Sequence, residues 1–483
     1  MKHSFGIAAV ALALVSLLVV TPRSEAQTVS GPMTNLVNNP TYAGYFDPVE
    51  RATAVAMEVA ANEIVNACDC AAFNNSNVYQ GLEASANQVN QFSPGDPQAV
   101  TLVMQIAGAL RGVAPEELSA QRTASNEFAR SQEDQLRGRL DALRGGAQGF
   151  ALNGYSSADR FARRDVPLIG GASADDLPAD FARWGGFFNV GYTHGTHDAT
   201  PLEDAFTAKG TDFSLGADYR FSAHGVLGLM LGYTDHKLTF DSTQSAPTDG
   251  EIKSKGWSEV LYASYDWDGP YVSASVGRQQ LSNDMIRIAH FEVPIVATPT
   301  DVVNSGSSDS TATTLTLDGG WALQSGAFGY EPLVRVLYRD TKFDAFNENS
   351  VDISTGNSSG LEFDYAERKV KSLNTALGMK VDYAFKPSFG VLIPYLQAEY
   401  QHEFKDDPMQ TSAIFGDVLA QGATSSLPLA VNSDNPDKSY FSAEIGAAAV
   451  FKHGIQAFLS ARSLFALADA KLYVISAGVR GEF

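Results

Sequence analysis

Apolar and polar residues alternate with a period close to two from residue 184 onward. Twelve segments share this alternation, are rich in aromatic and β-branched residues, and end at turn-forming residues. Strands of soluble sandwiches average about five or six residues, whereas crossing a membrane at a tilt takes about 9–11. The segments are longer than the soluble average and therefore predict membrane strands at residues 184–198, 211–222, 225–240, 252–268, 271–288, 311–324, 330–346, 370–385, 391–404, 439–451, 455–469 and 471–483.

The connections between these segments alternate in length. Long polar links at residues 241–251, 291–310, 347–369 and 405–438 alternate with short turns at 222–225, 268–270, 325–329, 386–390 and 452–454. Outer-membrane barrels have short periplasmic turns, longer external loops and an even number of strands. The chain is therefore predicted to be mainly β, with a C-terminal twelve-stranded antiparallel transmembrane β-barrel whose long links lie outside the cell.

The two faces of single strands differ in polarity. Val334, Val336 and Tyr338 alternate with Arg335 and Arg339. The apolar face is predicted to meet lipid and the polar face to line a wet lumen. Aromatic residues near the strand ends are predicted to form girdles at the membrane interfaces: Trp184, Trp257, Trp267, Tyr271 and Tyr330.

The N-terminus has the pattern of a secretory signal. Lys2 and His3 precede an apolar run at residues 7–20, and Ser24-Glu25-Ala26 supplies small residues at the cleavage positions. Residues 1–26 are therefore predicted to be a signal peptide. No other stretch approaches the roughly 20 apolar residues of a membrane helix, so only a closed barrel would span the membrane.

Residues 27–146 differ from the rest and predict a small α-helical region. Helices are predicted at 50–72 and 98–110, another begins at Pro115, and a long polar helix covers 121–144. That last helix would lie either on a small bundle or in the barrel lumen, and both arrangements remain open. Residues 147–183, with several glycines and prolines, predict a linker before the barrel at 184–483.

The charge and the cysteine content limit which partners and which metal sites are expected. The formal net charge of −21 argues against nucleic acid, which demands clustered Lys and Arg. The only cysteines, Cys68 and Cys70, form a Cys-Asp-Cys sequence. In an oxidising compartment a disulfide is favoured over free thiols or a metal, since two thiolates alone make a poor zinc site.

Catalytic chemistry is not predicted. Before Trp184 the only histidine is His3, so a serine triad has no base there. Gly-x-Ser-x-Gly, His-Glu-x-x-His and phosphate-loop motifs are absent from the sequence. We therefore expect no enzyme and no cofactor.

Three pairs of residues have side chains that could take part in catalysis or metal binding. Asp235-His236 and the pair Asp406-Asp407 lie near the predicted external rim, where surface hydrolases activate water, but neighbouring strand residues face opposite sides. His194 and His197 are three apart and also face opposite sides, so no metal site is predicted. A rim hydrolase is the third functional hypothesis.

Several motifs resemble the barrel domain of autotransporters, the type V secretion proteins. They cover residues 184–483 and include Arg183-Trp184-Gly185-Gly186-Phe187-Phe188, Leu215-Gly216-Ala217-Asp218-Tyr219-Arg220-Phe221-Ser222, Leu227-Gly228-Leu229-Met230-Leu231-Gly232-Tyr233, Ile393-Pro394-Tyr395-Leu396-Gln397-Ala398-Glu399-Tyr400-Gln401-His402-Glu403-Phe404 and Val479-Arg480-Gly481-Glu482-Phe483. The resemblance implies a barrel in the cell outer membrane that displays its own N-terminal region. It also implies that the assembly machinery reads a final-strand signal of Tyr473, Ile475, Ala477, Val479 and Phe483.

The chain departs from the family pattern at three points. Gly481 stands where an aromatic residue is common, the predicted helical passenger is short, and its last helix ends near Arg144 well before the first strand. No paired-asparagine cleavage signal occurs in that helix, so the passenger is predicted to stay attached. The expected partners are outer-membrane lipid, lipopolysaccharide, the assembly machinery and periplasmic chaperones, while a surface ligand is unknown. The second hypothesis is a pore or structural barrel with a periplasmic or lumenal N-terminal plug.

Overall fold

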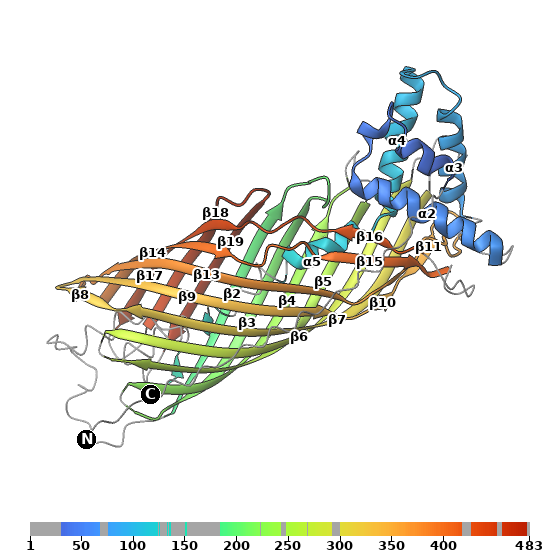
Figure 1. Cartoon of the computed structure of the whole chain (residues 1–483). Helices are drawn as coiled ribbons and strands as arrows, with labels where there is room; N and C mark the ends of the chain where they lie inside the picture. The colour runs from blue at the N-terminus through green and yellow to red at the C-terminus, as the bar shows by residue number, and fades with distance from the viewer. Residues whose placement is uncertain are drawn as a thin grey trace, which may run out of the picture.

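Twelve antiparallel strands close into a barrel (Figure 1). The protein, seen in a computed structural model, is described at residues 30–67, 76–123, 125, 133, 135–136, 150–151, 184–222, 224–242, 248–267, 269–291, 300–417, 427–451 and 456–480. Around the ring the strands follow the order β7, β6, β5, β4, β3, β2, β19, β18, β17, β14, β13, β9, and β9 pairs with β7 to close it. Their bounds are β2 Trp184–His197, β3 Phe206–Arg220, β4 Gly225–Phe240, β5 Thr248–Asp266, β6 Pro270–Phe291, β7 Thr300–Trp321, β9 Phe328–Phe343, β13 Arg368–Tyr383, β14 Gly390–Glu403, β17 Ser439–Phe451, β18 Gln456–Phe465 and β19 Ala470–Arg480.

The predicted strands are all present, and two have their predicted bounds. These are β4 and β17. The largest error concerns residues 291–310, predicted as a polar loop, because β7 already begins at Thr300 and its first residue pairs with Phe291. The serine-rich start of β7 looks like a loop by composition, yet its backbone is paired along the whole length of β6. Short strands β1 (Phe150–Ala151) and β8 (Leu323–Ser325) add to the ends of β2 and β9.

The two longest links form strands of their own, which the sequence did not predict. Four strands from residues 347–369 and 405–438 and their margins make a second sheet in the order β10 (Phe346–Asn347), β12 (Phe363–Tyr365), β15 (Gln410–Phe415) and β16 (Leu429–Asn432). A further strand, β11 (Asn349–Asp352), pairs with β7. The long links therefore extend this end of the barrel with a second sheet and with strand β11.

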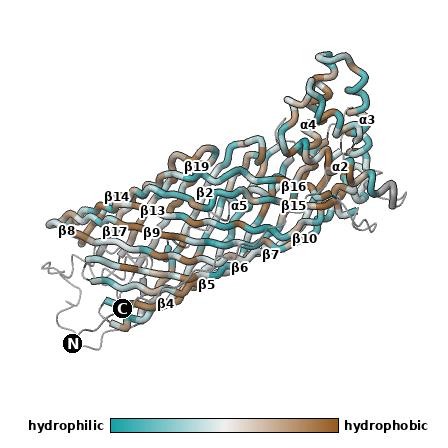
Figure 2. The backbone as a smooth tube through the Cα atoms, in the orientation of Figure 1, coloured by the Kyte–Doolittle hydropathy of each residue, from teal (hydrophilic) through white to brown (hydrophobic). Residues whose placement is uncertain are grey.

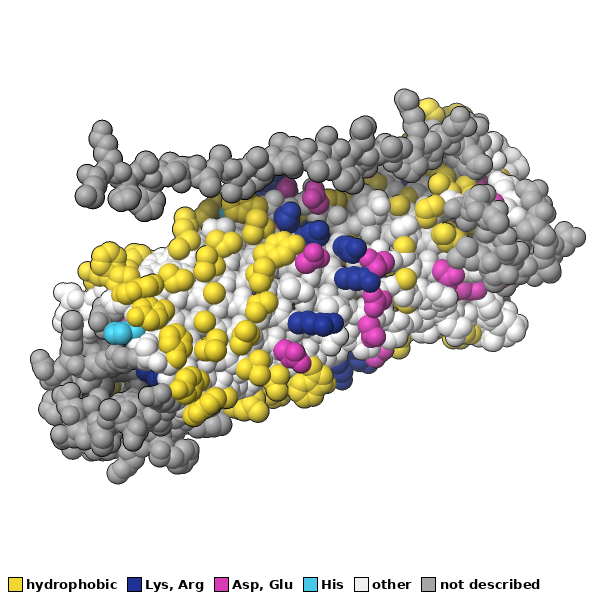
Figure 3. Space-filling model, turned by 60° about the horizontal axis from the view of Figure 1, so that its bottom comes forward, with side chains coloured by type: hydrophobic (Ala, Val, Ile, Leu, Met, Phe, Trp, Pro, Cys, Tyr) yellow, Lys and Arg dark blue, Asp and Glu magenta, His cyan; other side chains and the backbone are white. Residues whose placement is uncertain are grey.

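An apolar belt surrounds the half of the barrel that ends in short turns (Figures 2 and 3). On β4, Leu227, Leu229 and Leu231 point outward and are 46–50% exposed. The ring of Tyr233 lies edge-on to Trp257 of β5 at 4.9 Å, as interfacial aromatic residues do. The predicted faces of β9 are confirmed as well. Val334 and Val336 are exposed on the outer face, whereas Arg335 and Arg339 are buried on the inner face.

The polarity of both faces reverses beyond this belt. The outer face becomes charged there, with ion pairs such as Lys255–Asp235 at 3.1 Å and Lys438–Asp406 at 2.7 Å (Figure 3). The inner face becomes apolar, as Leu238 and Phe240 at the end of β4 are buried. The part of the barrel beyond the belt therefore has an apolar interior and a charged surface, as a water-soluble protein does.

The N-terminal helices pack into one small unit, here named the helical cap (residues 30–67 and 76–123). It comprises α1 Pro32–Val37, η1 Ala43–Tyr45, α2 Pro48–Ala67, α3 Asn77–Val89, α4 Pro97–Val113, η2 Glu116–Ser119 and α5 Ala120–Thr123. Asp96 caps α4 by accepting from the Gln98 amide at 2.8 Å, and Pro97 follows at the first helical position. Helix α3 lies within the region predicted to be helical but was not predicted as a separate helix. Among the described residues, no helix has the length and hydropathy needed to cross a membrane.

We predict that a charge on the belt destabilises the barrel whereas the same charge beyond it does not. Leu229→Arg should lower the free energy of unfolding by about 2–4 kcal/mol, because the guanidinium would face hydrocarbon near the membrane midplane. Thr239→Arg, on the outer face of the same strand beyond the belt, should cost about 0–1 kcal/mol. Guanidinium titration of the protein folded in phospholipid vesicles measures both values. Equal losses would mean that Leu229 does not face lipid.

Candidate functional site at the barrel mouth

The helical cap lies on the end of the barrel that carries the long links (Figure 1). The inner face of this mouth is apolar, with Phe206, Phe240 and Phe291 buried. These side chains belong to one continuous hydrophobic core that also contains Leu110 and Val113 of the cap. The cap therefore covers apolar surface that would otherwise face water.

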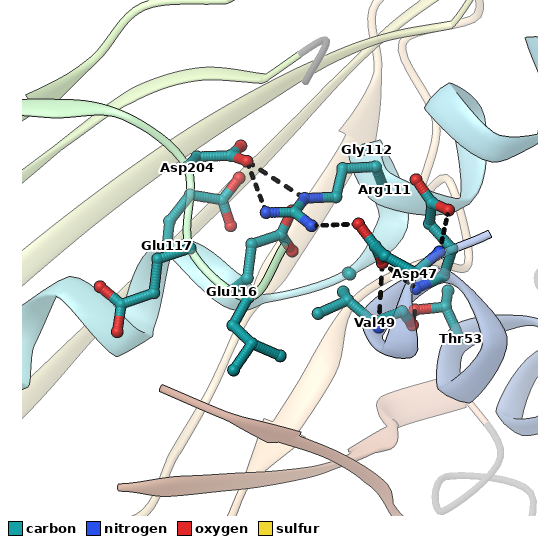
Figure 4. A network of polar contacts seen from close by, with 12 residues as sticks. Asp47, Val49, Thr53, Arg111, Gly112, Glu116, Glu117 and Asp204 are labelled. Carbon is teal, nitrogen blue, oxygen red and sulfur yellow. Dashed lines mark hydrogen bonds and ion pairs between the residues drawn. The ribbon is translucent and has the colours of Figure 1, made fainter. Parts of the chain in front are cut away.

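Arg111 of α4 joins the cap to the barrel (Figure 4). Its guanidinium lies 2.9 Å from Asp47, 2.9 Å from Asp204 and 2.6 Å from Glu116. It also donates to the carbonyl oxygen of Pro201 at 3.0 Å. Because Asp204 and Pro201 belong to the β2–β3 connection, one buried cation holds a cap helix against the barrel mouth.

Asp47 serves two elements at once. Its Oδ1 accepts from the amides of Val49 and Glu50 at 3.1 and 3.2 Å, while Glu50 accepts from the Asp47 amide at 2.9 Å. This reciprocal capping box begins α2. The other carboxylate oxygen of Asp47, Oδ2, accepts from Arg111 at 2.9 Å. The start of α2 and the end of α4 are thereby tied to the same guanidinium.

Arg287, from the far part of β6, closes the junction from the barrel side. Its Nη1 donates to the carbonyl oxygens of Gly112, Val113 and Ala114 at 3.0–3.2 Å, which are orphan acceptors at the end of α4. A cation at this position also interacts favourably with the helix dipole. Its Nη2 lies 3.3 Å from Glu348, whose other oxygen accepts from the Tyr365 hydroxyl at 2.9 Å. The second sheet is thus part of the same junction.

The junction holds more acids than bases. Two guanidinium groups face five carboxylates, those of Asp47, Asp204, Glu116, Glu117 and Glu348. Burial raises the pKa of Glu117 to about 8, against the opposing effect of Arg287. Burial together with the neighbouring Glu117 raises the pKa of Glu116 well above its usual value. The junction therefore binds protons near neutral pH.

The oxygens of Glu116, Glu117 and Asp204 lie within 4.8 Å of one another and have a geometry that a metal ion would accept. Arg111 already pairs with Glu116 and Asp204. Arg287 lies 3.9 Å from Glu117. We therefore assign this acidic group to structural ion pairing.

Four described residues just beyond the cap, 125, 133, 135 and 136, lie inside the barrel. Arg339, on the inner face of β9, donates to the Ser125 carbonyl at 2.7 Å and to Glu133 at 2.8 Å. On another side of the ring, Leu136 is buried in a cluster with Phe187 and Met230. Of the helix predicted at 121–144, residues 121–123 therefore belong to the cap, whereas the described residues 125, 133, 135 and 136 occupy the lumen.

The structure places part of the predicted assembly signal on the outer face of the last strand. Tyr473 and Ile475 of β19 are 44% and 45% exposed. Ala477 shares their face. Val479 lies on the same strand, whereas Phe483 is outside the described residues. The possible disulfide of Cys68 and Cys70 also lies outside the described residues and stays a prediction.

The residues considered for a rim hydrolase do not converge. Asp235 points outward and pairs with Lys255, while His236 points inward and lies 3.2 Å from Asp212. Asp406 pairs with Lys438. Asp407 is exposed in the same connection. His194 and His197 face opposite sides of β2, as predicted, since His197 is buried and His194 lies against Tyr473 on the outer face.

Sequence reasoning missed the residues of the junction. Arg111 and Asp204 are 93 positions apart. Arg287 and Glu348 are 61 apart. The one local signal was Arg111 itself, which is the only charged residue of helix α4. A lone charge in such a helix indicates a buried partner.

The chain belongs to the autotransporter beta-domain family, whose model matches residues 186–462, more than half of the chain. The family places the barrel in the outer membrane and in type V secretion, as the motifs predicted. Its barrel domain is a transport fold rather than a catalytic one.

Solved structures with a similar barrel include three autotransporter domains. The translocator domain of autotransporter NalP from Neisseria meningitidis is 13% identical, with a TM-score of 0.46, covering 75% of this chain and 99% of that one. The beta domain of the Bordetella autotransporter BrkA is 15% identical, with a TM-score of 0.41 and coverages of 62% and 100%. The transport unit of AIDA-I from Escherichia coli is 13% identical, with a TM-score of 0.38 and coverages of 68% and 99%. No curated protein matches the chain.

We predict that Arg111→Met loosens the cap. The change leaves the buried carboxylates of Asp204 and Glu116 without their cation, and breaking a buried pair in this way costs about 3–5 kcal/mol. Lys342→Met, which removes an exposed pair with Glu367, should leave the melting of the cap unchanged. Thermal melting of the helical circular dichroism signal in detergent measures both. A cap as stable in Arg111→Met as in Lys342→Met would contradict the assignment.

We also predict that the docked cap weakens as pH rises. The pKa of Glu117 is raised to about 8 in the docked state, above the 4.5 of the exposed group. Docking is therefore most favourable below about pH 4.5, and the stability that this proton contributes is lost progressively as pH rises through about 8.

Melting of the helical signal at several pH values between 5 and 9 tests this sign. Glu117→Gln should reduce the dependence, because an amide carries no titrating proton, while Glu116 keeps its own. Asp407→Asn, which removes an exposed acid, serves as the matched control and should keep the wild-type slope. A cap that becomes more stable at alkaline pH would overturn the prediction.

Proposed function

We propose that this protein anchors and displays its own N-terminal helical cap at the cell surface. The carrying observation is that the cap covers the mouth with the long links while Ser125, Glu133 and Leu136 lie in the lumen below it. Because long links face outward in outer-membrane barrels, a cap at this end would lie outside the cell. A signal peptide at residues 1–26 would bring the chain to the periplasm first.

The polar lumen supports passage of the chain through the barrel. Arg339 gives hydrogen bonds to both Ser125 and Glu133. A chain segment threaded through the pore needs such partners, because a buried polar group without one costs free energy. The cap would then stay attached, since Arg111 and Arg287 hold it at the mouth and the sequence shows no paired-asparagine cleavage signal. The proposal includes no catalytic activity for the cap.

The proposed partners follow from the outer face. The exposed apolar face of β19, with Tyr473 and Ile475, supports recognition of the last strand by the assembly machinery and by periplasmic chaperones. Lys253 and Lys255 stand beyond the Tyr233–Trp257 girdle, where phosphate groups of lipid and lipopolysaccharide would lie.

A second candidate function is a barrel plugged by its own N-terminal region. The observation in its favour is the same lumenal segment, since Ser125, Glu133 and Leu136 occupy space that an open pore would leave to water. In that case the cap would be a stopper for the mouth rather than a displayed passenger.

Two epitope tags at opposite ends of the molecule test the proposal. One tag is inserted at Gly95, in the turn between α3 and α4, and the other at Gly326, in the short turn between β8 and β9. Added protease should remove the Gly95 tag in intact cells and the Gly326 tag only after the outer membrane is opened. Protection of the Gly95 tag in intact cells would refute surface display.

A further inference from the structure

A second polar cluster lies at the mouth, away from the junction that holds the cap. The end of β2 and the β16–β17 and β18–β19 connections meet there around a cavity of about 70 Å³. The lining includes His197, Asp434, Asp437 and Asp469. This volume exceeds what a single water molecule needs, so a cation together with water would fit.

His197 is the fixed point of this cluster. It ends β2, is 7% exposed, and its ring stacks on Phe206 at 5.0 Å with an interplanar angle of 1°. Its Nδ1 is buried without a hydrogen-bond partner. Its Nε2 lies 3.9 Å from Oε2 of Glu203. That separation is too long for a hydrogen bond and suits two ligands that each lie about 2 Å from one shared ion.

The two carboxylates beside His197 are held in place by their own hydrogen bonds. Thr200 Oγ1 donates to Oδ2 of Asp434 at 2.6 Å. The Asp434 amide donates to Oε1 of Glu203 at 2.8 Å. One ligand atom from each of His197, Glu203 and Asp434 lies within 4.8 Å of the others. The ligands are therefore preorganised by groups in a supporting shell, as in metal sites.

The charges around the cavity favour a cation. Asp198, Asp434, Asp437 and Asp469 surround His197. Arg122, which also lines the cavity, donates to the carbonyl oxygen of Asp434 at 2.8 Å.

We propose that His197, Glu203 and Asp434 bind one divalent transition-metal ion such as Zn²⁺. One imidazole nitrogen and two carboxylate oxygens form a three-ligand set that zinc accepts, with the remaining position open to water in the cavity. The ion would tie the end of β2 to the connection that precedes β17. Since His197 pairs with Ala470 of β19, it would also clamp the seam between the first and last strands of the ring.

Zinc titration of the full-length protein in detergent tests this site. The protein is purified without a polyhistidine tag in a Cys68→Ser, Cys70→Ser background, so that neither a tag nor these thiols bind the metal. After removal of metal, competition with a chromophoric chelator should reveal one equivalent of Zn²⁺. His197→Ala and Glu203→Gln should each weaken binding at least about 100-fold, since even supporting residues change affinity by about 10–100-fold.

His194→Ala, three residues away on the opposite face of β2, is the matched control and should bind like the parent. Thr200→Val tests the supporting shell and should weaken binding by about 10–100-fold without removing a ligand. Heat-dependent electrophoretic mobility verifies that each variant is folded. If the parent binds no Zn²⁺, if folded His197→Ala and Glu203→Gln both keep parental affinity, or if only Ca²⁺ binds, the proposal is overturned.

Discussion

Hydrogen bonding of the backbone is the constraint on which the whole structure depends. A membrane interior offers no partner to a peptide group, so each strand that crosses it must pair on both sides. The pairing of β9 with β7 meets this need by closing the ring. Closure also creates an inner and an outer face along every strand. On β4 the outer face is apolar at Leu229 and charged further along at Lys237, while the inner face ends in Phe240.

This reversal of polarity explains why the barrel carries a helical cap. The apolar inner face of the mouth would be exposed to water if nothing covered it, and the helices supply that cover. Apolar contact alone does not specify how a cap sits. Arg111 and Arg287 do, because an incorrectly docked cap would bury their charges without partners at a cost of several kcal/mol. These ion pairs thus determine position more than they add stability.

The predictions from sequence succeeded where local alternation decides the structure and failed where pairing partners do. The bounds of β4 and β17 were predicted correctly because lipid outside and polar lumen inside leave a period of two. The start of β7 was missed, since beyond the belt Ser307 and Asp309 face water like loop residues and only their pairing with β6 makes them a strand. The short strands of the second sheet were missed for the same reason.

The sequence by itself determined the class of the protein, its twelve strands and the end of the barrel that carries the long links. These features depend on alternation and on turn residues, which are local properties of a chain that contacts both lipid and water. Only the tertiary structure decided which distant charges meet at the mouth. Arg111 finds Asp204 across 93 positions and Arg287 finds Glu348 across 61. Such pairs leave no periodic trace in the chain, since their energy depends on burial and on distances that exist only after the ring has closed.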